Sequence, residues 1–139
     1  MLILDTNIIS EMMRPAPHER AAAWIDARPL DQLALTAITV AELLYGLDRL
    51  PDGRRKADLS GRLDAVLRRG FGGRVLPFDH AAAQAYARLK GDGDRAGRPL
   101  GGYDAMIAAI AQTHGAGIVT RNVDDFAGCG VPIINPWAD

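Results

Sequence analysis

Short apolar runs that alternate with helix-like stretches restrict the fold of this sequence more than any other feature. Four runs stand at 1–5, 33–36, 74–78 and 117–120, and 131–134 is a candidate fifth. Their lack of apolar–polar alternation predicts strands that are buried on both faces. Such strands, separated by helices, are typical of a parallel sheet with helices on both sides. We therefore expect an α/β fold with a central parallel sheet of four to five strands.

The segments between these runs carry signals for helices. Helices are expected at about 7–13, 18–28, 39–50, 54–69, 80–90 and 103–114. The four residues 39–42 (TVAE) match a capping box, with Thr39 as N-cap and Glu42 as its partner. A turn at 51–53 (PDG) would join two of the helices into a helical hairpin. The glycine-rich stretch 91–102 is expected to be a loop.

Length and composition narrow the class of protein. The chain has 139 residues, which suit a single domain over 1–139. Cys129 is the only cysteine, which excludes an internal disulfide and fits a reducing compartment. The opening MLILDTNIIS has no basic start of a signal peptide, and no run approaches the roughly 18 apolar residues of a membrane helix. A soluble cytoplasmic protein with no membrane partner is expected.

Charge is unevenly distributed, although the net charge is only -1. The segment 49–98 has twelve Lys or Arg against six acids, whereas acids outnumber cations on both sides of it. A basic surface beside an acidic site would suit an enzyme that acts on nucleic acid. Alternatively, the cations of 54–69 are simply the solvated face of one helix. The charge pattern alone favours neither interpretation.

Several familiar catalytic sites are absent from the sequence. There is no P-loop, no dinucleotide-binding glycine motif and no G-x-S-x-G. One cysteine and three scattered histidines do not supply a zinc site. Asp92 and Asp94 hint at a calcium loop, but Ala96 and Tyr103 occupy later ligand positions.

Polar residues at strand ends and helix starts remain as carriers of chemistry. Asp5 ends the first strand, Glu42 and Asp104 stand at helix starts, and Asn122 and Asp125 follow the fourth strand. In a parallel sheet such positions meet at one edge. Clustered carboxylates repel one another unless a cation joins them, and Mg²⁺ or Mn²⁺ prefers oxygen ligands. The pattern therefore predicts metal-assisted hydrolysis of a phosphodiester.

Each acid also has a structural alternative. Asp5 and Asp104 could cap helices, and Glu42 could serve the capping box. Asp124 and Asp125 could be ordinary loop acids. Considered one at a time, the acids leave these alternatives open.

Taken together, these residues resemble the PIN-domain family, in particular the VapC-type toxins of VapBC toxin–antitoxin pairs. The resemblance rests on four motifs in family order: 3–7 (ILDTN), 39–43 (TVAEL), 104–108 (DAMIA), and 120–122 (TRN) running on to Asp125 and Phe126. The ending Pro136-Trp137 resembles one branch of these toxins. Asn122 is a departure, because some members have an aspartate there. An asparagine supplies no charge, so a second metal would depend on Asp125 or Asp124.

The resemblance implies a three-layer α/β/α fold and a single PIN-like nuclease domain over 1–139. It implies a Mg²⁺-dependent endoribonuclease, with Mn²⁺ able to substitute. Asp5, Glu42 and Asp104 are then the expected metal ligands, and Asn122 and Asp125 would hold a metal-bound water or a second ion. Thr6 is expected to bond Asp5 or a metal-bound water, or only to start a helix.

The resemblance also implies partners. These are an RNA substrate, a second copy of the chain in a homodimer, and a cognate VapB-like antitoxin. An antitoxin peptide would lie in a groove beside the acids, with the helical hairpin at 38–69 as one wall. Basic residues of 54–74 would meet RNA phosphates.

Two other classes of function remain open. One is a Mg²⁺-dependent phosphohydrolase of small phosphate esters, against which the missing D-x-D start counts. The other is a non-catalytic regulator that binds nucleic acid or a partner, which only Asn122 favours. No short motif specifies the RNA target, because RNA is recognised largely by shape and by its loops.

Overall fold

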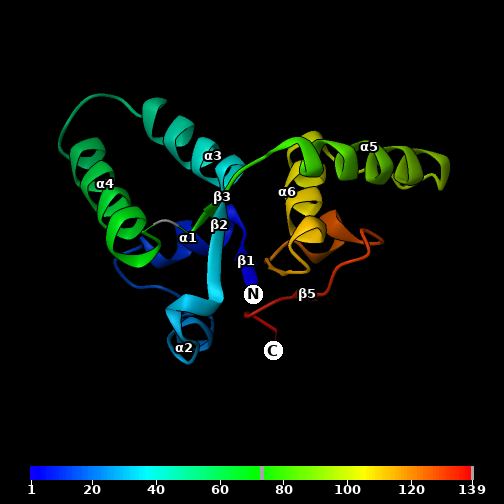
Figure 1. The fold of residues 1–139 in the computed structure, drawn as a ribbon. Helices are drawn as coiled ribbons and strands as arrows, with labels where there is room; N and C mark the ends of the chain where they lie inside the picture. The colour runs from blue at the N-terminus through cyan, green and yellow to red at the C-terminus, as the bar shows by residue number, and fades with distance from the viewer. Residues whose placement is uncertain (73, 139) are drawn as a thin grey trace.

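A five-stranded parallel sheet lies at the centre of the molecule in the computed structural model, which describes residues 1–72 and 74–138 (Figure 1). The strand order is β3-β2-β1-β4-β5, and every neighbouring pair is parallel. The strands are β1 (Leu2–Leu4), β2 (Leu33–Thr36), β3 (Val75–Leu76), β4 (Gly117–Val119) and β5 (Ile133–Ile134). Each expected apolar run contains one strand, which confirms the predicted sheet.

Burial follows position in the sheet. All four residues of β2 and all three of β4 are buried, as the missing alternation predicts. The edge strands β3 and β5 have two residues each and are shorter than the runs 74–78 and 131–134 that predicted them. Short edge strands offer few unpaired backbone groups to another chain.

Helices connect the strands and cover both faces of the sheet. In the described part of the chain they are α1 (Thr6–Met12), α2 (Glu19–Asp26), α3 (Ala37–Asp48), α4 (Arg54–Ala65), α5 (His80–Arg95) and α6 (Gly102–Thr113). A π-helical turn (Val66–Gly70) extends α4, and 3₁₀ turns occupy Leu30–Gln32 and Val123–Phe126. None of these described helices is long and apolar enough to cross a membrane.

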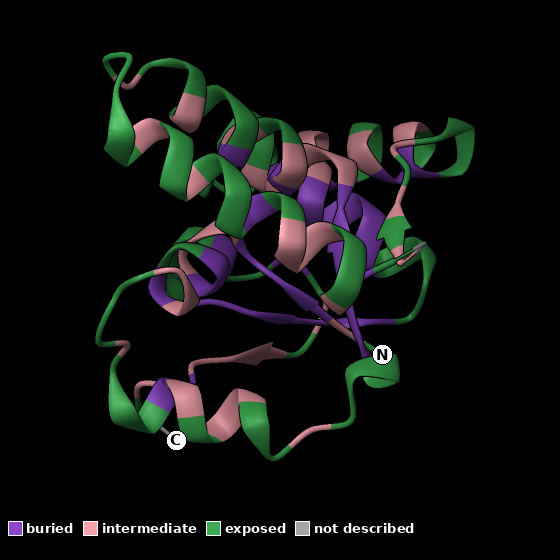
Figure 2. Cartoon of the chain, turned by 90° about the vertical axis from the view of Figure 1, so that its left-hand side faces the viewer, coloured by how far each residue is buried: buried purple, intermediate pink, exposed green. Residues whose placement is uncertain are grey.

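Two hydrophobic clusters, one on each face of the sheet, produce the three layers. One cluster joins the sheet to α5 and α6 through residues such as Leu89 and Ile107. The other joins it to α1, α3 and α4 through residues such as Ile8, Leu43 and Leu63. Figure 2 shows the buried residues gathered in the sheet and on the sides of the helices that face it. The expected three-layer α/β/α fold is confirmed.

The predicted capping box at the start of α3 is wrong. The N-cap is Thr36, whose hydroxyl accepts a hydrogen bond from the backbone N–H of Thr39 at 3.0 Å. Thr36 is the last residue of β2 and has extended backbone angles, so the strand passes directly into the helix. Because Thr39 lies inside the first turn, Glu42 has no capping duty.

The expected loop at 91–102 is shorter than predicted, because α5 continues through Gly91 and Gly93 to Arg95. Packing of α5 against α6 compensates for the low helix propensity of glycine. A Cβ on Gly93 would come within 2.8 Å of the Arg98 carbonyl oxygen, so this glycine permits the close return of the chain.

Candidate active site

Asp5 is the most firmly held of the acids at the sheet edge. It follows β1, caps α1, and is only 6% exposed. Its Oδ1 accepts from the backbone N–H of Thr6 at 2.8 Å, and its Oδ2 accepts from the Thr120 hydroxyl at 2.8 Å. Asn7 donates to the same Oδ2 at 3.2 Å. Burial raises the pKa of Asp5 above its usual value, although these hydrogen bonds oppose the rise.

Glu42 lies in α3 and reaches the same edge of the sheet. Its Oε1 accepts a hydrogen bond from the Thr6 hydroxyl at 2.9 Å. The Thr6 side chain therefore holds Glu42, whereas the sequence interpretation gave it Asp5 or a water as partner. Burial, and then repulsion from Asp5, raises the pKa of Glu42.

Asp104 lies in the first turn of α6. The predicted alternative, a capping role, is wrong: the N-cap is Gly101, and no side chain caps this helix. Burial, and then the charges of Asp5, Asp125 and Glu42 in that order, together raise the pKa of Asp104 to about 6. Carboxylates from four separate segments of the chain therefore interact along this rim.

Asp125 and Asn122 lie in the segment after β4. Asp125 is exposed, yet its charge raises the pKa of both Asp5 and Asp104. Asp124 is not among the charges that do so, which favours Asp125 as the further acid of the site. Asn122 is exposed and donates its backbone N–H to the Thr120 hydroxyl at 3.0 Å. Its side-chain carbonyl is therefore not needed to hold the loop.

Thr120 and Asn7 are two site residues for which the sequence interpretation gave no role. Thr120 is fully buried, and its hydroxyl joins Asp5 to Asn122. Asn7 donates to Asp5 and accepts from the backbone N–H of Arg121 at 3.1 Å. Both residues stand inside motifs that were noted for their acids. The signal that could have revealed them is their place just beyond two paired strands, since Thr120 directly follows β4 and Asn7 stands three residues after β1.

The donor set of this rim suits a hard divalent cation. It consists of carboxylate, hydroxyl and amide oxygens, and the carboxylates raise one another's pKa, a cost that a cation would remove. Within residues 1–72 and 74–138, however, no three acidic, histidine or cysteine side chains form a ready-made cage. The acids are thus close enough to interact but are not closed around a common point.

A groove of about 970 Å³ opens beside this rim, between α1, α3 and α4. Thr6 and Glu42 line its acidic end, and Arg54, Arg55 and Arg62 line the side formed by α4. The helical hairpin does form a wall, as expected. Not every cation of 54–74 is available to bind RNA phosphates. The Arg74 side chain donates to the carbonyls of Leu33 and Gly70 and so belongs to the fold.

Comparisons with known proteins identify the family and agree with the fold. The PIN domain model matches residues 2–128. The chain is 43% identical to the VapC ribonuclease Y4jK of Sinorhizobium fredii over 99% of this chain and 98% of the relative. It is 41% identical to the toxin FitB of Neisseria gonorrhoeae over the full length of both chains. The crystal structure of FitAcB from Neisseria gonorrhoeae superimposes with a TM-score of 0.92, at 41% identity and 99% coverage of each chain.

The family model spans most of the chain, and the relatives match it nearly from end to end. The rim that the fold assembles comes from the same motifs that carried the resemblance. The chain belongs to the PIN-domain family, among the VapC-type ribonuclease toxins of toxin–antitoxin systems.

Proposed function

We propose that this protein is a Mg²⁺-dependent endoribonuclease that acts as the toxin of a type II toxin–antitoxin pair. The observation that carries the proposal is the convergence of Asp5, Glu42, Asp104 and Asp125 on one rim, with mutual effects on their pKa values. Without a cation, repulsion between these carboxylates destabilises the folded protein. A bound metal ion would remove the repulsion and would be attracted by the same charges. The relative from Sinorhizobium fredii is itself named a ribonuclease.

Each residue of the rim has a distinct task in this proposal. Asp5 and Asp104 would bind the metal, and Mn²⁺ would substitute for Mg²⁺. When bound, the ion would supply a Lewis acid for the phosphodiester and lower the pKa of water beside it. Glu42, fixed by the Thr6 hydroxyl, would complete the site and position the attacking water. Asn122 and Asp125 would hold a metal-bound water or a second ion on the side of β4.

Substrate binding would use the basic wall of the groove. Arg54 and Arg55 are exposed on α4, and the groove they line leads to Glu42. Binding through phosphates releases counterions, so RNA affinity should fall as salt rises. This arrangement fits the positive charge of 49–98, which the net charge of the whole chain conceals.

A cognate VapB-like antitoxin would occupy the same groove. Leu43, Leu47, Leu59 and Leu63 line its floor and walls. An amphipathic peptide would bury its apolar side there, and an arginine of that peptide would reach Glu42 and compete with the metal. We further propose a homodimer, as the resemblance implies.

The deciding experiment is cleavage of a mixed cellular RNA pool by purified protein free of antitoxin. Mg²⁺, Mn²⁺ and EDTA would be compared, with Asp5→Asn and Asp104→Asn as inactive variants and Asp124→Asn as the matched control. We expect discrete products that need metal, Asp5 and Asp104 but not Asp124. Cleavage that persists in EDTA or in Asp5→Asn would refute the metal mechanism. Protein that is folded and binds metal, yet cuts no RNA, would favour the binding regulator.

The partners need separate tests. Co-expression with the neighbouring open reading frame should yield a complex in which cleavage is suppressed, and Leu59→Glu in the groove should weaken that complex. Light scattering of the purified protein should give twice the mass of one chain. A monomer at all concentrations would contradict the proposed dimer.

A further inference from the structure

Arg121 is the only Lys or Arg in residues 99–139, a stretch that carries four acids. It is exposed and directly follows Thr120, which holds Asp5. Within the described residues it forms no ion pair, whereas Arg14, Lys56, Arg68 and Arg95 each have an acidic partner. A cation that follows an acidic rim in the chain would be expected to form an ion pair with one of its carboxylates. The absence of such a pair at Arg121, among the residues that the structure describes, therefore needs an explanation.

Trp137 provides the explanation. The Arg121 guanidinium carbon lies 5.2 Å from the centre of the Trp137 ring, within the range of a cation–π contact. Trp137 is partly buried against the cluster formed by α1, α3 and α4, so its own position is supported. The guanidinium thus lies over the tryptophan, and within the described residues it forms no ion pair with the acids of the rim. Pro136-Trp137 is also the sequence motif that the proposed function does not use.

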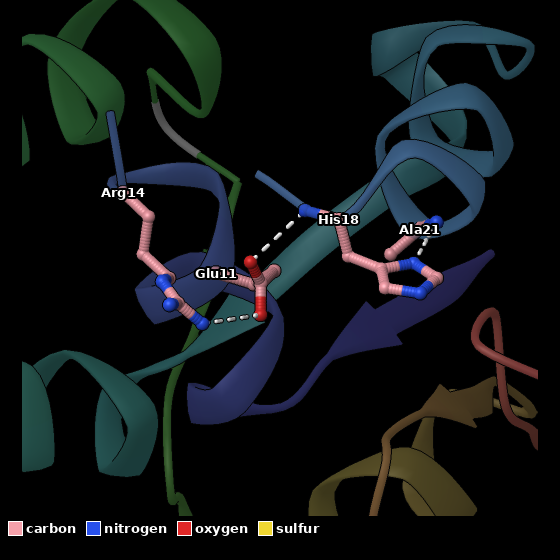
Figure 3. A network of polar contacts seen from close by, with 4 residues as sticks. All are labelled: Glu11, Arg14, His18 and Ala21. Atoms are coloured by element: carbon pink, nitrogen blue, oxygen red, sulfur yellow. Dashed lines mark hydrogen bonds and ion pairs between the residues drawn. The ribbon is translucent and has the colours of Figure 1, made fainter. Parts of the chain in front are cut away.

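His18 lies beside Trp137, the aromatic partner in the cation–π contact with Arg121. Its ring lies 6.3 Å from that of Trp137, at an angle of 43°. Figure 3 shows how His18 is held: the buried Glu11 carboxylate accepts from its backbone N–H at 3.1 Å, and its Nδ1 accepts from Ala21 at 3.4 Å. Glu11 also pairs with Arg14 at 3.5 Å. A buried carboxylate outside the active site thus fixes the residue that borders Trp137.

The backbone of Arg121 is tied to the catalytic rim. Its N–H donates to the Asn7 side chain at 3.1 Å, and Asn7 donates to Asp5 at 3.2 Å. Two hydrogen bonds, both through the Asn7 side chain, therefore link the Arg121 backbone to the Asp5 carboxylate. The Arg121 guanidinium at the other end of the residue lies over Trp137. Within residues 1–72 and 74–138, this guanidinium lies over Trp137 and forms no ion pair with an acid, so its N–H donors remain for a ligand.

We propose that Arg121, supported by Trp137, binds a backbone phosphate of single-stranded RNA next to the bond that is cut. A planar guanidinium matches the two oxygens of a phosphate, which is the anion that the acidic rim itself would repel. This inference rests on the proposed ribonuclease function and adds a substrate-positioning residue to it. Trp137 acts through Arg121 by limiting the orientations of its guanidinium.

The test measures RNA binding separately from cleavage. Single-stranded RNA of mixed sequence would be titrated against protein carrying Asp104→Asn, so that no cleavage occurs, over a series of salt concentrations. Adding Arg121→Ala should weaken binding about tenfold, the usual value of a charged hydrogen bond. It should also lower the slope of log K against log salt by about 0.7, the value for one phosphate contact on a single strand. Arg88→Ala removes the same charge from an exposed position on α5 and should leave the slope unchanged.

Variants of the support distinguish positioning from charge alone. In otherwise active protein, Arg121→Lys keeps the charge and should raise KM with little change in kcat. Trp137→Leu should do the same, and Trp137→Phe should restore most of the affinity because an aromatic face remains. Circular dichroism would establish that each variant is folded. An unchanged salt slope in Arg121→Ala, in protein that binds RNA, overturns the inference alone. Wild-type protein that neither binds nor cuts RNA overturns the proposed function.

Discussion

Asp5 and Asp104 lie on one rim and both have raised pKa values, but they are held in different ways. The Asp5 carboxylate accepts hydrogen bonds from Thr6, Asn7 and Thr120. Within the described residues, no hydrogen bond reaches the Asp104 carboxylate, and only burial and other acids act on it. The β1 side of the rim is thus organised by hydrogen bonds within the protein, whereas burial and repulsion act on the α6 side without such support in the described residues. The predictions below test this difference.

Replacing each acid by alanine in the absence of metal should change stability in opposite directions. Asp5→Ala removes a helix cap and leaves the buried Thr120 hydroxyl without its acceptor, so unfolding should become easier by roughly 2–4 kcal/mol. Asp104→Ala removes a repelled carboxylate and should make unfolding harder by about 1 kcal/mol. Urea unfolding in EDTA measures both values. Equal destabilisation of the two variants would contradict the proposed difference in how Asp5 and Asp104 are held.

The second prediction concerns pH. The pKa of Asp104 is raised to about 6 from an ordinary value of 3.8, so folding favours its protonated form. The resulting stabilisation is complete below about 3.8 and is lost as pH rises through about 6. In EDTA at neutral pH, Asp104→Asn should therefore be more stable than wild type by about 1–2 kcal/mol, a value reduced for solvent screening.

Unfolding in EDTA at a series of pH values should make the advantage of Asp104→Asn disappear as pH falls below about 4, where Asp104 is protonated in both states. Asp124→Asn is the matched control, because Asp124 is not among the charges that raise the pKa of Asp104. An advantage of Asp104→Asn that is independent of pH would mean that repulsion is not its cause.

The third prediction concerns the hydroxyl that holds Asp5. Thr120→Val keeps the shape of a fully buried side chain but removes its hydrogen bonds to Asp5 and Asn122. We expect a loss of roughly 1–3 kcal/mol in stability and about tenfold in RNA cleavage. Thr120→Ser retains the hydroxyl and should recover most of the cleavage. If valine and serine behave alike, the hydroxyl does not organise the rim.

The smallest effect is expected at Asn122, in the segment after β4. Asn122→Asp would add a carboxylate to a segment that already holds Asp125, so repulsion without metal should rise and Mn²⁺ affinity should increase by roughly threefold to tenfold. Calorimetric titration of Mn²⁺ into wild type and variant gives the ratio. Asp124→Asn serves as control and should change affinity little, because Asp124 is not among the charges that raise the pKa values of Asp5 and Asp104.

Much of the candidate site could be predicted because it follows strand ends. Asp5 and the segment after β4 lie at the carboxyl ends of paired parallel strands, which brings them to one edge whatever the side-chain details. Glu42 and Asp104 were also placed correctly, although the capping roles considered for them were wrong. Cap signals extend over a few residues, and Thr36 and Thr39 are both threonines near one strand–helix junction. Only the position at which β2 ends decides between them.

By itself, the sequence determined the order of strands and helices, the apolar faces that bury them, and the acids that stand at their ends. These features depend on local backbone preference and on the spacing of apolar residues, both of which can be read within a short window. Tertiary structure alone decided that α5 continues through Gly91 and Gly93, that Thr120 donates to Asp5, and that the Arg121 guanidinium lies over Trp137. Asp5 and Thr120 are 115 residues apart. Contacts across such separations depend on how the packed layers align, which no local pattern specifies.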